Sequence, residues 1–263
     1  LVVGAGLIGL KCVEGILDRV GSVTVVDLAV RILPSILDEE GSAIVQERLG
    51  ARGVSFILGD CAVRYAPGLA TLRSGKEVPF DILVIAAGVR PNVSLVREAG
   101  GEVNRGIVVN DRQETTIPDV YAAGDNCESY DICSGTRRIL ALLPNAAFQG
   151  ETAGRNMAGG DAAFDKAAPF NALGLFDTHI ATAGVYEGET YTDTSEGYKK
   201  LFVKDNKLVG FILIDCIERA GIYTSLIREQ TPLDTVDFEL LKKNPALMAF
   251  ARGTRAEILT RRR

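Results

Sequence analysis

The stretch LVVGAGLIGL, residues 1–10, decides the fold of the first part of this chain. Its three leading apolar residues predict a short buried strand, and its glycines at positions 4, 6 and 9 follow a G-x-G-x-x-G spacing. In such a turn the first glycine permits a tight bend, the second lets a ligand approach the backbone, and the third lets helix and strand pack closely. The residues predicted to surround a bound pyrophosphate are Gly4, Gly6, Leu7, Ile8 and Gly9.

The residues after this turn extend it into a strand–helix–strand unit. Apolar residues recur at helical spacing between positions 10 and 20, and Gly21 supplies a helix stop. The β-branched stretch VTVVD, residues 23–27, predicts a strand that ends in Asp27. This acid follows Gly9 by 18 positions (27 minus 9), close to the ~20 expected for a carboxylate that binds a ribose hydroxyl. The complete pattern favours a Rossmann-like dinucleotide site over a purely structural glycine turn.

Asp27 also bears on the choice of dinucleotide. A carboxylate accepts hydrogen bonds from a free 2′-hydroxyl and repels a 2′-phosphate, which favours NAD over NADP. Arg31 lies further along the same segment and could meet a phosphate. The sequence therefore favours NAD and leaves NADP as the alternative.

Composition narrows the class of protein. At 263 residues the chain has room for about two domains, and its 47% hydrophobic and 24% charged residues are ordinary for a globular protein. The net charge of −5 argues against a nucleic-acid surface, and no apolar run reaches the ~18 residues of a membrane span. Glycines interrupt the apolar start at once, so a signal peptide is not expected. We interpret the basic tail, residues 261–263, as a solvated end.

The cysteines and the single histidine point away from a metal site. None of the five cysteines forms a C-x-x-C pair. We interpret them as reduced thiols of a cytoplasmic protein, with Cys127 and Cys133 unlinked and a redox pair as the alternative. His179 is interpreted as structural, and no residue is identified as catalytic.

Short strands are predicted from residue 53 to residue 88. GVSFIL at 53–58 predicts one strand, and the Ser74-Gly75 pair predicts a hairpin turn. The near-continuous apolar run DILVIAAG, residues 81–88, predicts a central parallel strand buried on both faces.

The stretch TTIPDVYAAGDNCE, residues 115–128, resembles the second flavin motif of the pyridine-nucleotide-disulfide oxidoreductase family. In that family a strand ends in aromatic-Ala-x-Gly-Asp, matched here by residues 121–125. The resemblance implies that Asp125 accepts hydrogen bonds from FAD hydroxyls and that Gly124 lets the cofactor pass close to the backbone. An Asp that closes an ordinary turn is the alternative.

The stretch LALLPNAAFQGETAGRNMAGG, residues 140–160, resembles the helix that follows this motif in the family. Its Ala146–Gly150 segment matches the family pattern A-x-x-Q-G. Pro and Asn residues at 144 and 145 suit a helix start. The resemblance implies that Asn145 and Ala146 lie at the flavin, where the helix N-terminus stabilises negative charge on the reduced ring. A merely packed amphipathic helix is the alternative.

The resemblance extends over most of the chain, because GAGLIGL, VTVVD, RILPSILDEE and AAGVRPN (with Gly88) are similar to the family's NAD domain. It implies an α/β protein with a Rossmann-like NAD domain at 1–88, the remainder of a split FAD domain at 89–164, and a C-terminal α+β domain at 165–263. The single glycine motif is then the one for NAD. The N-terminal half of the FAD domain is expected to be absent from this chain.

The last hundred residues resemble the C-terminal domain of NADH-dependent rubredoxin, ferredoxin and nitrite reductases. Two strands joined at Asp205-Asn206 are predicted, then helices at 217–230 and after Pro232. In related enzymes this domain often forms a dimer interface, which makes a homodimer an option. Many members carry Glu near the flavin where this chain has Lys11, so the role of Lys11 stays open.

The resemblance implies a flavoprotein oxidoreductase that passes hydride from NADH to FAD. Electrons then go to a small electron-transfer protein or to a small-molecule acceptor. The alternatives within the family are disulfide or CoA-disulfide reductases and NADH oxidases. A non-enzymatic NAD-binding sensor is the alternative outside it.

Overall fold

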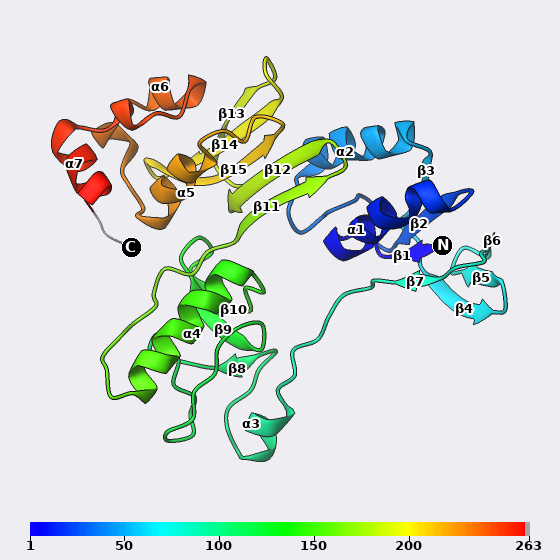
Figure 1. Ribbon diagram of the computed structural model, residues 1–263, viewed down its shortest axis with the longest axis horizontal. Helices are drawn as coiled ribbons and strands as arrows, with labels where there is room; N and C mark the ends of the chain where they lie inside the picture. Colours follow the sequence, from blue (N-terminus) through cyan, green and yellow to red (C-terminus); the bar gives the residue numbers. More distant parts are fainter. Residues whose placement is uncertain (261–263) are drawn as a thin grey trace. The chain divides into compact units, whose positions relative to one another are not determined.

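The computed structural model describes residues 1–260, without the side chains of 257 and 258, and divides the chain into two compact units (Figure 1). Unit 1 comprises Leu1–Val89 with Leu173–Ile180, and unit 2 comprises Arg90–Ala172 with Ala181–Arg263. The basic tail that was interpreted as a solvated end lies outside the described residues. Within the described range, no helix is both long enough and apolar enough to cross a membrane.

Unit 1 is built on a parallel four-stranded sheet. In spatial order its strands are β3 (Val54–Leu58), β2 (Val23–Asp27), β1 (Val2–Val3) and β7 (Val84–Ile85). Strand β2 spans the predicted residues, because its β-branched side chains suit a pleated buried surface. The prediction that 81–88 forms a central strand buried on both faces is wrong. Strand β7 is short and lies at the sheet edge, where it has one neighbour, and Ile85 is 61% exposed.

Two helices accompany this sheet. Helix α1 spans Leu7–Ile16 and buries Leu10 and Val13, and it tightens into a 3-10 turn at Leu17–Arg19. Helical spacing predicted that this helix continues to residue 20, but the α-helix ends at Ile16. Helix α2 spans Glu39–Ala51 and begins where the carboxylate of Asp38 accepts a hydrogen bond from the Gly41 N–H at 2.9 Å.

A separate antiparallel meander interrupts unit 1. Its strands are β4 (Ala62–Ala66), β5 (Leu69–Leu72) and β6 (Glu77–Pro79). The predicted hairpin turn is confirmed, because the Gly75 N–H donates to the Leu72 carbonyl at 3.0 Å and Gly75 has φ +89°.

The first part of unit 2 joins a small sheet to a long helix (Figure 1). It contains α3 (Ser94–Glu98), β8 (Ile107–Val108), β9 (Cys127–Asp131), β10 (Thr136–Arg138) and α4 (Leu143–Met157). The strand expected to end in Tyr-Ala-Ala-Gly-Asp is wrong. Tyr121 makes only an isolated antiparallel bridge with Glu114, and the Ala122 N–H donates to the Gln113 carbonyl beside it.

The second part of unit 2 carries most of a five-stranded sheet. In spatial order its strands are β11 (Phe170–Leu175), β12 (Thr178–Gly184), β15 (Lys207–Ile214), β14 (Tyr198–Lys204) and β13 (Glu189–Asp193). The predicted turn between β14 and β15 is confirmed, because Asp205 and Asn206 both have left-handed φ values, 50° and 58°. Helix α5 (Ala220–Arg228) packs Tyr223 against Phe211, with ring centroids 5.7 Å apart.

The single helix predicted after Pro232 is wrong. The chain forms a 3-10 turn at Leu233–Thr235, helix α6 at Phe238–Lys243, another 3-10 turn at Leu247–Ala249 and helix α7 at Arg252–Thr260. Val236 bridges to Phe250, which pulls the backbone out of helical conformation. Asp237 then starts a new helix by accepting from the Leu240 N–H at 2.9 Å.

Candidate functional site

The three glycines of the first motif have three different surroundings. Gly4 has φ +116°, and a Cβ placed on it would lie 2.2 Å from the Ala86 carbonyl oxygen. A Cβ on Gly9 would lie 1.9 Å from the Gly4 carbonyl oxygen, so helix α1 and the turn touch through backbone. A Cβ on Gly6 would meet nothing within 4 Å. The turn is therefore closed by the outer glycines and open at the middle one, where a ligand can approach the backbone.

The N-terminus of α1 opens onto this same turn. Gly6 is the N-cap residue and supplies no side chain to satisfy the first N–H groups of the helix. Leu7 and Ile8 follow it, and both are exposed. Uncapped N–H groups with the positive end of the helix dipole attract an anionic group such as a phosphate.

Asp27 is held against the glycine turn. Its Oδ2 accepts a hydrogen bond from the Ala5 N–H at 2.5 Å, and its Oδ1 accepts one from the Ala29 N–H at 2.7 Å. These two bonds fix the direction of the carboxylate at the end of β2. Each oxygen keeps a further lone pair, so ribose hydroxyls can still donate to it.

The sequence singled out two further residues in unit 1, Gly88 and Arg31. Gly88 follows β7 with φ +102°, and a Cβ on it would meet nothing within 4 Å. Arg31 directs Nη2 to the Pro34 carbonyl at 3.4 Å, and its Nε is buried without a hydrogen-bond partner. The Arg31 guanidinium group is thus held by the backbone of Pro34, three residues further along the chain.

Lys11, whose role the sequence left open, has a structural contact. It forms an ion pair with Glu14 and donates to the Gly174 carbonyl at 3.1 Å. The Phe176 N–H donates to Glu14 in turn, and the Arg52 guanidinium lies 4.8 Å from the Phe176 ring centroid. Lys11 therefore joins α1 to the tip between β11 and β12.

The second predicted cluster lies in unit 2, in the loop before β9. Gly124 has φ +91°, and its N–H donates to Gln149 Oε1 at 2.6 Å. Asp125 is exposed, and its carboxylate makes no hydrogen bond or ion pair with the described part of the chain. The loop thus presents an unpaired carboxylate, and its backbone is held at Gly124 by the hydrogen bond to Gln149.

The start of α4 lies beside this loop. A Cβ on Gly124 would lie 3.8 Å from the Cβ of Ala146, so the structure brings these two predicted residues together. The side chain of Asn145 is buried and donates to the Ala168 carbonyl at 3.0 Å. Asn145 therefore anchors the helix start through its side chain, and its backbone is the part left at the helix terminus.

Three polar residues around this loop are not predicted from the sequence as site residues. Gln149 belongs to the A-x-x-Q-G pattern, which by itself indicates no contact for its side chain. Gln113 Oε1 and Asn126 Oδ1 are buried and have no hydrogen-bond partner among the described residues. Only the A-x-x-Q-G pattern could have pointed to Gln149, because the contact joins residues 25 positions apart.

The cysteines in the described residues are all free, which confirms that Cys127 and Cys133 are unlinked. Burial, with smaller contributions from nearby carboxylates, raises the pKa of each of these two thiols to about 12. A thiol with such a pKa is almost entirely protonated near neutral pH, so neither is suited to act as a nucleophile. His179 lies exposed on β12.

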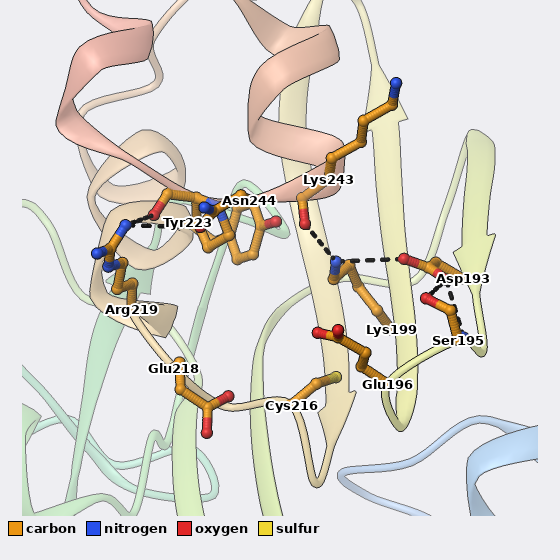
Figure 2. Close-up of a pocket in the computed structure, with 11 residues that line it drawn as sticks. Asp193, Ser195, Glu196, Lys199, Cys216, Glu218, Arg219, Tyr223, Lys243 and Asn244 are labelled. Atoms are coloured by element: carbon orange, nitrogen blue, oxygen red, sulfur yellow. Dashed lines mark hydrogen bonds and ion pairs between the residues drawn. The ribbon is translucent and has the colours of Figure 1, made fainter.

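A cavity of about 680 Å³ lies in the C-terminal part of unit 2 and contains none of the predicted cofactor residues (Figure 2). Figure 2 shows the Lys199 amine between Asp193 and the end of α6. Lys199 donates to the carbonyls of Lys242 and Lys243 at 3.0 and 3.2 Å. Its charge is therefore used to hold a helix C-terminus. Among the described residues, none of the buried side-chain nitrogen or oxygen atoms without a hydrogen-bond partner belongs to the lining of this cavity.

Comparison with known proteins identifies the family. Residues 1–150 match the family described as pyridine nucleotide-disulphide oxidoreductase, and residues 169–231 match the rubredoxin NAD+ reductase C-terminal domain. The NADH-dependent phenylglyoxylate dehydrogenase subunit epsilon of Aromatoleum evansii is 30% identical over 89% of this chain and 58% of its own length. The nitric oxide reductase FlRd-NAD(+) reductase of Klebsiella pneumoniae is 38% identical over 49% of this chain and 35% of its own length.

The fold also matches solved structures. The NAD-dependent persulfide reductase from A. fulgidus has a TM-score of 0.83 and 24% sequence identity, covering 98% of this chain and 54% of that chain. The chain thus spans between about a third and just over a half of the length of these relatives. With its parallel Rossmann-like sheet, its antiparallel C-terminal sheet and a family match over more than half of its residues, the chain belongs to the pyridine nucleotide-disulphide oxidoreductase family.

Proposed function

We propose that this chain forms the NADH-binding part, and one side of the FAD site, of a flavoprotein oxidoreductase. In this proposal residues 1–88 bind NADH, residues 89–164 hold part of FAD, and residues 165–263 form the C-terminal domain. A bound flavin supplies the redox chemistry, since it accepts hydride from a nicotinamide and releases electrons to an acceptor. The protein residues position the two cofactors and select between them.

The open face at Gly6 is the observation that carries the NADH part of the proposal. The space above Gly6 adjoins the uncapped N-terminus of α1 and therefore suits a pyrophosphate. Asp27, tied to Ala5 of the same turn, then accepts the ribose hydroxyls of the adenosine. A 2′-phosphate placed at this carboxylate would be repelled, so we propose NADH as the preferred donor.

The loop at Gly124 carries the flavin part of the proposal. Asp125 offers an unpaired carboxylate to ligand hydroxyls beside the N-terminus of α4. Buried acceptors without donors lie on both sides of the motif, at Gln113 and Asn126, which fits a site built for a hydroxyl-rich ligand. The N-terminus of α4, near Ala146, stabilises negative charge on a reduced flavin ring.

The C-terminal domain supports a small redox protein as the electron acceptor. It matches the C-terminal domain of rubredoxin NAD+ reductase, and the Klebsiella pneumoniae relative is named as a FlRd-NAD(+) reductase. A reductase that works through a thiol of this chain gains no support from Cys127 and Cys133, because the pKa of each thiol is raised.

A titration of NADH and NADPH into the wild type and the Asp27→Asn variant tests the proposal. The variant keeps the size of the side chain and removes its charge. We expect NADH affinity to fall by roughly 10- to 150-fold, the equivalent of about 1.5–3 kcal/mol for a hydrogen bond to a charged group. Affinity for NADPH should fall less, because repulsion of the 2′-phosphate disappears as well.

Asp38→Asn is the matched control. It removes the same charge from a residue that caps α2, and Asn caps helices as well as Asp. Its NADH affinity should equal that of the wild type. Equal affinities of the wild type for NADH and NADPH, or an unchanged preference in Asp27→Asn, would reject the assignment of Asp27.

A further inference from the structure

Gln149 connects helix α4 to the loop that presents Asp125. Its side chain is 1% exposed. Its Oε1 accepts the Gly124 N–H at 2.6 Å, and its Nε2 donates to Ser129 Oγ at 2.6 Å. One buried side chain therefore ties the loop, strand β9 and helix α4 together through hydrogen bonds.

The other side of Gly124 is held as well. Its carbonyl oxygen accepts the Cys127 N–H at 3.2 Å and the Cys127 thiol at 3.3 Å. With both backbone groups of Gly124 engaged and its φ at +91°, the chain leaves this residue in one direction. The next residue is Asp125, whose own side chain has no hydrogen-bond partner in the described residues and so cannot fix its own direction.

We propose that Gln149 is the positioning residue that aims Asp125 at the hydroxyl groups of the flavin nucleotide; this inference rests on the flavin site proposed above. Gln149 belongs to α4, whose N-terminus is the other part of that site. The helix terminus and the carboxylate are thus held at a constant separation by a single amide. Gln149 does not touch the ligand, and its effect passes through the Gly124 peptide.

Gln149→Met removes the hydrogen bonds of Gln149 to the Gly124 N–H, Ser129 and the Cys127 thiol, and it keeps a side chain of similar length. The Gly124 N–H then loses its acceptor, and the loop is free to turn. We expect the dissociation constant for FAD to rise by about ten- to hundredfold, the usual effect of leaving a buried donor unpaired. Gln149→Glu restores an acceptor for the Gly124 N–H and should recover part of this loss.

Asn156→Leu is the matched control on the same helix. Asn156 is also a buried amide, and it bonds to the backbone at Arg112 and Ala162 rather than to the loop at 124. Asn156→Leu removes these hydrogen bonds and should lower the melting temperature about as much as Gln149→Met does. It should leave the dissociation constant for FAD unchanged, which separates positioning from stability.

The experiment uses the natural protein that contains residues 1–263, stripped of flavin and titrated with FAD. Flavin fluorescence gives the dissociation constant. Hydrogen exchange at the Gly124 amide reports directly on its hydrogen bond to Gln149. Faster exchange and weaker FAD binding in Gln149→Met, with neither in Asn156→Leu, support the inference. Faster exchange with unchanged FAD binding overturns it. A wild-type protein that binds no FAD overturns the proposed flavin site itself, whatever the exchange result.

Discussion

At the scale of single residues, the first glycine motif separates folding from ligand binding. Gly9 and Gly4 are required by the backbone, because a methyl group on either would overlap a carbonyl oxygen. Gly6 is not required by the fold, because its missing side chain faces open space. Because Gly6 lies at the uncapped N-terminus of α1, a ligand that approaches the backbone there best explains this glycine.

Alanine substitutions at three glycines test this distinction. Gly9→Ala should destabilise the protein by about 1–3 kcal/mol or more through overpacking. Gly6→Ala should leave stability close to that of the wild type and weaken NADH binding by about tenfold or more, since its methyl group occupies the ligand's space. Thermal unfolding and NADH titration measure the two effects.

Gly15→Ala is the control for this series. Gly15 lies exposed in α1, and a Cβ there meets nothing within 4 Å. The substitution should stabilise α1 by about 0.5–1 kcal/mol and leave NADH binding unchanged. If Gly6→Ala binds NADH as Gly15→Ala does, the pyrophosphate does not lie at Gly6.

At the scale of elements, helix α6 shows how a short helix is held by another element. It spans only Phe238–Lys243, too short to be stable by itself. Asp237 caps its start, and Lys199 of β14 binds its last carbonyls. Lys199 is 8% exposed, so water cannot replace it easily.

Lys199→Met should therefore lower stability by about 1–3 kcal/mol, because two carbonyls lose a charged donor. Lys204→Met is the control, since Lys204 pairs with Glu187 at an exposed position where an ion pair contributes about 0–1 kcal/mol. Urea unfolding of both variants gives the comparison. Equal losses of stability would mean that Lys199 does not hold the helix end.

At the scale of the whole molecule, the reactivity of the cysteine thiols bears on whether this chain reduces its acceptor through a thiol. Its five cysteines are free and differ in burial. Cys127 and Cys133 both have pKa values raised to about 12 by burial. Because the thiolate is the reactive form, only about one in 10⁴ of these groups is ionised at pH 8.

Alkylation with iodoacetamide at pH 8 checks this. In the native protein, Cys127 and Cys133 should react far more slowly than Cys12 and Cys61, because the pKa of both thiols is raised to about 12. Peptide mass spectrometry follows the labelling. Unfolding in urea should make all five reactive and serves as the control. Rapid labelling of native Cys127 or Cys133 would favour a thiol-based reductase over direct electron transfer from the flavin.

Local patterns in the sequence were sufficient for the features that depend on near neighbours. Strand β2 and the Asp205-Asn206 hairpin are both decided within a few residues, through β-branched side chains and through steric limits on φ. The family could also be identified from short motifs, because each motif places its glycine and its acid at a fixed spacing.

Tertiary structure alone decided the contacts between residues that are far apart in the sequence. The edge position of β7 depends on which strands join the sheet, and the break before α6 depends on a bridge between Val236 and Phe250. Lys11 meets Gly174 across 163 positions, and Gln149 meets Gly124 across 25. No periodicity encodes such contacts, because they form only when packing brings the segments together. The sequence by itself thus determined the family and the residues that suit a dinucleotide, whereas the folded structure decided which of them are free to bind one and which are held by the protein.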